Sequence, residues 1–303
     1  MSRPVVVLAG GTGGAKLARG MLDVVGPEEL VVIANTGDDI EIYGGYVSPD
    51  PDLVTFWLAD RIDERGWGLE DDTFKVMDAL RQLGVEVWFN LGDGDLAIAL
   101  ERARALAGGA RPTEAHGTIA RALGVRAAVL PMSDEPVRTR VLAQERSWAF
   151  QEFMILGRGE GPVADVEFAG AKHARPTREV LDAIHAARAI VIGPSNPFVS
   201  IGPILAVAGM REAIVNAPAK VVAISPLVGG QVLKGPTDVF MQWSGKPLSS
   251  DGIAAIYTGV IDGLVADQRT ELVPMLDTDV LMDSAANRAR VAEQALGFAL
   301  ALS

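Results

Sequence analysis

The chain has 303 residues, of which 49% are hydrophobic and 22% are charged, a composition typical of a globular protein of one or two domains. It contains no cysteine, which excludes disulfides, thiolate zinc sites and cysteine nucleophiles. The formal net charge of −12 argues against a broad nucleic-acid surface, because phosphate backbones are held by clustered lysine and arginine.

The sequence also disfavours two further classes, membrane-spanning proteins and proteins with a signal peptide. No run reaches the roughly 18 residues that a membrane-spanning helix needs, and the first residues lack the features of a signal peptide. We therefore expect a cytoplasmic protein with no membrane partner and no nucleic-acid partner. A single nucleotide needs only a local site and remains compatible with the charge.

Six short apolar runs predict strands, at residues 5–9, 30–34, 85–89, 126–130, 189–192 and 220–225. Segments with helical periodicity lie between most of them. Continuous apolar strands that alternate with helices are typical of a parallel sheet covered on both faces. The sequence therefore predicts an α/β fold with a doubly wound, mostly parallel, Rossmann-like sheet.

One stretch departs from this alternation. Residues 137–176 alternate more like strands, contain a glycine-rich turn at residues 157–162 and show no clear helix. We interpret them as an inserted β-rich or irregular segment that caps the sheet, and residues 1–136 and 177–303 as the nucleotide-binding core. Such an insertion often shapes the pocket of a second substrate, but a purely structural hairpin fits the sequence equally well.

A glycine-rich turn follows the first predicted strand in "AGGTGGAKL" and contains Gly10, Gly11, Gly13 and Gly14. These glycines allow a sharp turn and a close approach of a ligand, and the N–H groups at the start of the next helix attract phosphate. The spacing fits neither the dinucleotide fingerprint, because Lys16 replaces its last glycine, nor a P-loop. Lys16 is as compatible with a solvated lysine as with a phosphate contact.

Acidic residues gather after the second predicted strand, in "ANTGDD" and "SPDPD". Asn35, Asp38 and Asp39 fall at the carboxyl edge of the sheet, where open α/β sheets bind ligands, and Asp50 follows on a loop. Carboxylates near a phosphate-binding turn repel one another unless a proton or cation intervenes. We therefore predict that Asp38, Asp39 and Asp50 hold Mg²⁺, whereas Asp52 is expected to cap a helix.

The later strand ends carry weaker signals. Asp93 in "NLGDGD" either caps the following helix or belongs to the site, and Ser195 and Asn196 in "GPSNPF" either contact a nucleotide or close a turn. The histidines have no visible partner and are expected to be structural or solvated: His116 and His173 on exposed segments, and His185 in a helix.

Taken together, "AGGTGGAKL", "NTGDD", "SPDPD", "NLGDGD", "LPMSDEPVRT", "IGPSNPFVSIGPIL" and "ISPLVGG" resemble the 2-phospholactate transferase family, often called CofD. The blocks keep the family's order over residues 5–233. The resemblance implies synthesis of the deazaflavin coenzyme F-420. A phospholactyl, phosphoenolpyruvyl or related group would pass from a guanosine diphosphate-linked donor to FO, a deazariboflavin, giving F-420-0 or dehydro-F-420-0 and GMP. It also implies Mg²⁺ dependence and a homodimer.

The resemblance assigns roles to single positions. It places FO against Asp50, which is also the catalytic candidate, and against Asn90. Asn90 and Gly94 stand where many members have basic residues, so positive charge is lost near the acceptor. The guanine nucleotide would be held by Gly10, Gly11, Thr12, Gly13, Gly14, Lys16, Asn35, Ser195 and Asn196.

Two other functions share parts of this pattern. A regulatory nucleotide-sugar binder related to the gluconeogenesis factor would have the glycine turn and the fold, but is not expected to combine "SPDPD" with "GPSNPFVSIGP". A dinucleotide-dependent oxidoreductase is disfavoured because Lys16 breaks the fingerprint.

Overall fold

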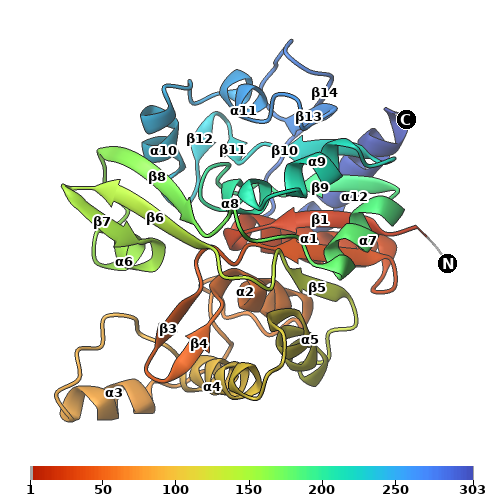
Figure 1. Cartoon of the computed structure of the whole chain (residues 1–303). Coiled ribbons are helices and arrows are strands. Elements are labelled where there is room, and N and C mark those ends of the chain that lie inside the picture. Colours follow the sequence, from red (N-terminus) through yellow and green to blue (C-terminus); the bar gives the residue numbers. More distant parts are fainter. Residues whose placement is uncertain (1–2, 303) are drawn as a thin grey trace.

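The fold is taken from a computed structural model, which describes residues 3–302. Within these residues seven strands form one sheet: β1 (Val5–Ala9), β2 (Leu30–Ala34), β5 (Ala128–Pro131), β9 (Ala189–Ile192), β10 (Lys220–Ile224), β13 (Gly263–Ala266) and β14 (Met275–Asp277). Their order is β14-β13-β10-β9-β1-β2-β5, and every neighbouring pair is parallel (Figure 1). The predicted α/β class is confirmed, and all seven carboxyl ends lie at one edge.

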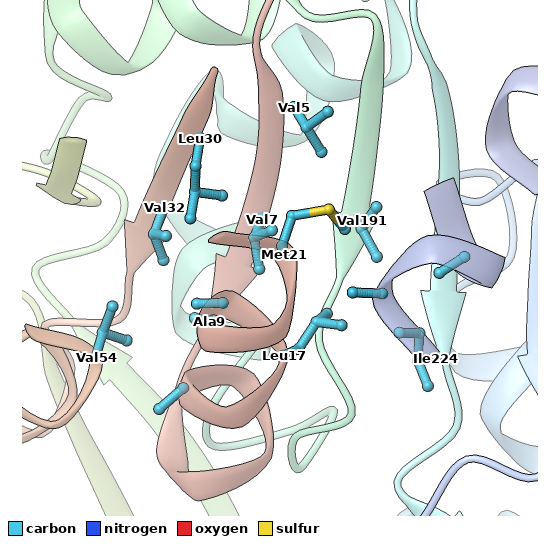
Figure 2. Close-up of a cluster of buried hydrophobic side chains, with 14 of the residues drawn as sticks. Val5, Val7, Ala9, Leu17, Met21, Leu30, Val32, Val54, Val191 and Ile224 are labelled. Carbon is cyan, nitrogen blue, oxygen red and sulfur yellow. The ribbon is translucent and has the colours of Figure 1, made fainter. Parts of the chain in front are cut away.

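Both faces of the sheet are covered by helices because its strands are apolar on both sides. Val5 and Val7 of β1 belong to a cluster with Leu17 and Met21 of α1 (Gly11–Val25), which Figure 2 shows. Helices on that face are α1, α2 (Pro49–Leu58) and α12 (Ala285–Ala301). The other face is covered by α7 (Arg178–Ala186), α8 (Gly202–Ala206), α9 (Met210–Val215) and α11 (Ser250–Ile256).

The predicted inserted segment is strand-rich, as its alternation indicates. The strands β6 (Arg138–Ala143), β7 (Arg146–Ala149) and β8 (Val163–Ala169) form an antiparallel sheet in the order β7-β6-β8, which projects to one side of the central sheet (Figure 1). The expectation of no helix here is wrong, because α6 (Phe150–Ile155) buries Phe150 and Phe153 against this sheet.

The remaining elements surround the sheet. They are the hairpins β3 (Ile40–Ile42) with β4 (Gly45–Val47) and β11 (Leu227–Val228) with β12 (Gln231–Val232), and the helices α3 (Lys75–Gln82), α4 (Asp93–Ala107), α5 (Pro112–Ala122) and α10 (Thr237–Ser244). Among the helices of residues 3–302, none is long and apolar enough to cross a membrane.

The predicted strand at residues 85–89 is wrong. This segment is irregular chain after α3, and β5 is the strand that pairs with β2. Val87 and Phe89 pack instead against the small cluster around Met77, while Leu83 is 79% exposed. The structure also adds β13 and β14, which the sequence did not predict.

The expected cap at Asp93 is wrong as well. The N–H of Gly94, at the start of α4, is accepted by Asp72 at 2.8 Å. Asp93 instead accepts the N–H groups of Lys75 and Val76 at 3.1 and 3.0 Å, and so caps α3. The N-terminus of α4 is therefore capped by Asp72, which precedes α3, and the N-terminus of α3 is capped by Asp93, the first residue of α4.

Candidate functional site

The glycine turn joins β1 to α1 and packs against the loop after β9. A Cβ at Gly13 would lie 1.9 Å from the carbonyl oxygen of Pro194, and one at Gly10 would lie 2.7 Å from that of Ser200. Gly11 has φ +61°, which favours glycine. Close packing and backbone conformation therefore favour glycine at these three positions, whether or not a ligand binds here.

Ser195 holds this loop against the turn. Its hydroxyl accepts the N–H of Gly14 at 2.9 Å and donates to the carbonyl of Gly10. Asn196 closes the next turn, because its Oδ1 accepts the N–H of Phe198 at 2.9 Å. Its buried Nδ2 has no hydrogen-bond partner within residues 3–302 and is therefore a donor available to a ligand.

Asp50 connects three of the predicted site segments. It lies in the first turn of α2, where its Oδ1 accepts the N–H of Gly11 at 2.7 Å and its Oδ2 accepts Nδ2 of Asn35 at 2.9 Å. Asn35 follows β2 and is itself fixed by the N–H of Gly37, at 2.7 Å. Burial raises the pKa of Asp50 to about 6, against the opposing effect of its two N–H partners.

Asp38 and Asp39 lie beside Asp50 but differ in their partners. Asp39 is satisfied, since its carboxylate accepts the hydroxyls of Ser48 at 2.7 Å and Tyr46 at 3.0 Å, and burial raises its pKa to about 7. Asp38 is buried too, but its Oδ1 has no partner in the described chain. Burial, followed by the nearby charge of Asp50, raises the pKa of Asp38 well above its ordinary value. We call Asp38, Asp39 and Asp50 the carboxylate row.

The row is not a preformed metal cage. In residues 3–302 no group of three histidine, cysteine or acidic side chains is arranged to hold a metal ion. Mg²⁺ commonly takes one or two carboxylates and completes its shell with water and substrate phosphate. The free oxygen of Asp38 fits that donor set, whereas each oxygen of Asp39 and of Asp50 already accepts one hydrogen bond.

Two predicted site residues lie apart from the row. Asn90 is exposed and accepts a hydrogen bond from Arg81 at 2.6 Å. Within residues 3–302 no hydrogen bond joins it to Asp50. Lys16 is half-buried on α1, with its Nζ 5.9 Å from the ring centroid of Trp57.

Asp52 and His116 also differ from expectation. Asp52 does not cap α2. It forms a buried ion pair with Arg102, in which Nη1 of Arg102 lies 3.1 Å from Oδ2 of Asp52. His116 is buried on α5, with its Nε2 3.1 Å from the hydroxyl of Thr55, and burial lowers its pKa to about 3. It is therefore a neutral core residue, not an exposed one.

The structure adds two polar residues that the sequence did not single out, Tyr46 and Arg138. With Thr36, which follows β2 as expected, they line part of a cavity of about 220 Å³ beside Asp39. Arg138 donates to the hydroxyl of Tyr46 at 3.0 Å, and the buried hydroxyl of Thr36 has no partner in residues 3–302. The only signal in the sequence is the "VRT" that opens the inserted segment.

Comparison with known proteins identifies the family. The sequence matches the family described as 2-phospho-L-lactate transferase CofD over residues 5–295. It is 38% identical to a 2-phospho-L-lactate transferase of Methanosarcina acetivorans, covering 88% of this chain and 86% of the relative. The corresponding enzyme of Methanothermobacter thermautotrophicus is 41% identical, with 87% and 85% covered. A phosphoenolpyruvate transferase of Kitasatospora aureofaciens is 38% identical, with 95% and 96% covered.

A solved structure supports the fold separately. A crystal structure of a Bacillus halodurans protein superposes with a TM-score of 0.64 at 20% identity, covering 98% of this chain and all of the other. A second structure from that organism, titled as a member of the UPF0052 family, gives a TM-score of 0.62 at 19% identity, with 98% and 99% covered. From its sequence, the chain belongs to the CofD family of 2-phospho-L-lactate transferases, enzymes that transfer a phosphorus-containing group.

Proposed function

We propose that the chain transfers a phospholactyl, phosphoenolpyruvyl or related phospho-acid group from a guanosine diphosphate-linked donor to FO, and that GMP leaves. The observation that carries this proposal is the position of Asp50. It is bonded to the first amide of α1 and to Asn35, and it lies beside the unpartnered oxygen of Asp38. A phosphoryl group at the start of α1 would therefore lie next to two carboxylates.

The start of α1 supports a site for the diphosphate. The amides of Gly11 and Gly14 are taken by Asp50 and Ser195, but no side chain of residues 3–302 accepts from those of Thr12 and Gly13. Free amides at a helix N-terminus favour an anion. The buried Nδ2 of Asn196 can donate to an oxygen of the base or ribose.

Mg²⁺ belongs to the same proposal. Asp38 would hold it through its free oxygen, and Asp50 through a lone pair left beside its two hydrogen bonds, because Asp50 lies at the start of α1. Asp39 keeps Tyr46 and Ser48 in place. Bound there, the ion would neutralise the charge on the phosphoryl oxygens and on the departing GMP. This assignment narrows the predicted set of three ligands to two.

The reaction needs no covalent intermediate with the protein. The ribityl hydroxyl of FO attacks the phosphorus that bears the acid group, and the bond from that phosphorus to the oxygen of GMP breaks. One carboxylate of the row takes the hydroxyl proton, and the amides at the start of α1 stabilise the developing negative charge. Asn90 remains a predicted FO contact, with less support because its side chain is bonded to Arg81.

The test is an incubation with FO, Mg²⁺ and each GDP-linked donor in turn. GMP release coupled to an acidic deazaflavin product supports the proposal and identifies the donor. Binding of the donor without GMP release would favour a regulatory nucleotide-binding protein, and reduction of a nicotinamide cofactor would favour an oxidoreductase. Light scattering on the same sample checks the homodimer, and cell fractionation checks the cytoplasmic location.

A further inference from the structure

Lys16 on α1 has two cationic neighbours from distant parts of the chain. Lys16 lies on α1, Lys234 follows β12, and Arg288 lies on α12. Burial and the charges of the other two lower the pKa of Lys16. We call these three residues the cation cluster.

The packing of α12 against α1 fixes one side of the cluster. A Cβ at Gly20 would lie 2.3 Å from the carbonyl oxygen of Arg288, so the two helices touch through their backbones. The guanidinium of Arg288 lies 5.0 Å from the ring centroid of Trp57, and Nζ of Lys16 lies 5.9 Å from the same point. Both cations are therefore held against one indole.

The loop after β12 brings the third cation to the first turn of α1. Nζ of Lys234 donates to the carbonyl of Arg65 at 3.3 Å. A Cβ built at Gly66 would lie 3.9 Å from that Nζ and 4.0 Å from Cγ2 of Thr12. Lys234 thus lies close to the amides at which we place the diphosphate.

The nearby acids are engaged elsewhere. Asp23 and Asp60 pair with Arg19 at 2.5 and 2.6 Å, and Asp283 accepts from Asn287 at 2.7 Å. Among the ion pairs of residues 3–302, none includes a member of the cation cluster, and the buried Nε of Arg288 has no hydrogen-bond partner there. The charge of Asp283 acts on Lys16, and the charges of Asp23 and Asp60 act on Arg288, but within residues 3–302 none of these acids forms an ion pair with the cluster. A bound anion would relieve the repulsion that remains among the cations.

We propose that the cation cluster binds an oxyanion of the donor, either its diphosphate or the carboxylate of its phospho-acid group. This inference rests on the proposed function, because it assigns the negative end of the same donor. It extends the donor site beyond the glycine turn to Lys234 and Arg288. It also gives a role to three cations that have no part in the carboxylate row.

The first experiment measures GDP binding by calorimetry for Lys234→Met and for the control Lys172→Met, an exposed lysine on the turn before α7. Lys234 is exposed on its loop, so the substitution leaves the fold intact, and thermal melting checks this. If the cluster holds the diphosphate, Lys234→Met weakens the binding of GDP about tenfold and that of GMP less, while Lys172→Met leaves the affinity for both nucleotides unchanged. Arg288→Met provides a second variant with the same expectation.

A second experiment separates the two sources of the oxyanion. If the cluster holds the carboxylate, GDP affinity stays within twofold in Lys234→Met, but KM for the complete donor rises about tenfold. Unchanged GDP affinity together with unchanged KM would overturn the inference and leave the proposed function standing. If the parent protein neither binds GDP nor releases GMP, the proposed function fails. Weaker binding of inorganic pyrophosphate to Lys234→Met would then still support an anion site.

Discussion

The two sides of the start of α1 differ in how the chain treats its own polar groups. On the inner side, Gly13 packs on the loop after β9, and Ser195 and Asp50 accept backbone amides. On the outer side, Lys16 lies among cations with no ion pair in residues 3–302. On the inner side the protein's own loop and side chains thus pack against the turn, whereas on the outer side no ion pair in residues 3–302 neutralises Lys16. Changes to the packed glycines on the inner side should cost stability, and changes to the cations on the outer side should cost binding.

The largest expected effect is on the inner side, at Gly13. An added Cβ would lie 1.9 Å from a backbone oxygen, so Gly13→Ala must displace the loop after β9 and should destabilise the fold by about 3 kcal/mol or more. Denaturant unfolding measures the change. Gly297→Ala is the control, since that exposed glycine in α12 has open space and alanine should stabilise it by about 0.5–1 kcal/mol. Equal stability of the two variants would contradict the packing described.

Asp50 should combine a large effect on activity with a small effect on stability. Asp50→Asn keeps the shape of the side chain but places an amide group against Gly11 or Asn35 and removes the charge beside Asp38. We expect GMP release to fall at least about 100-fold, with Tm within a few degrees. Asp251→Asn, in the first turn of α11 and exposed, should leave both unchanged. Near-normal turnover by Asp50→Asn would refute its role.

Asp95 shows the cost of burying an acid beside the charges of other acids, here Asp72 and Asp52. Burial raises its pKa to about 7, and its Oδ1 has no partner in residues 3–302. Because the folded pKa lies above the unfolded value near 4, the stability contributed by the protonated form is complete below pH 4 and is lost as pH rises through 7. Asp95→Asn should therefore gain at most about 4 kcal/mol over the parent at pH 8, and little at pH 4. A gain that does not depend on pH would contradict this.

The smallest expected effect on stability is on the outer side. Lys16→Met removes one of three neighbouring like charges, so Tm should stay within about 2 °C of the parent or rise slightly. The difference should shrink in high salt, which screens the repulsion. Lys172→Met is the matched control. A loss of more than about 5 °C would show that Lys16 is a structural residue.

Much of the fold was predictable because β1, β2, β9 and β10 are short continuous apolar runs between helices. Residues 85–89 are also rich in apolar side chains, but Val87 and Phe89 pack against the cluster around Met77 and the segment does not join the sheet. The edge strand β14 was missed because it is three residues long and only partly buried. Local composition indicates which segments can form strands, while the competition for positions in the sheet is decided by tertiary packing.

The site was predictable where its residues directly follow strands. Asn35 and Asp38 follow β2, and the structure brings Asp50 to them through a hydrogen bond to Asn35. Lys234 and Arg288 could not be found in this way, because they lie more than 200 residues from the glycine turn and reach it only through the packing of α12 and the loop after β12. The two hydroxyl partners of Asp39 are invisible in the sequence, so its difference from Asp38 could not be predicted.

The most direct measurement compares Asp38→Asn with Asp39→Asn in the transfer reaction with FO, Mg²⁺ and the GDP-linked donor. GMP and the deazaflavin product are quantified together, and melting confirms that both variants fold. We predict that the parent forms one GMP for each deazaflavin product, that Asp38→Asn loses both products, and that Asp39→Asn keeps most of its activity. Parental rates in Asp38→Asn, or GMP release without a deazaflavin product in the parent, would contradict the proposed function.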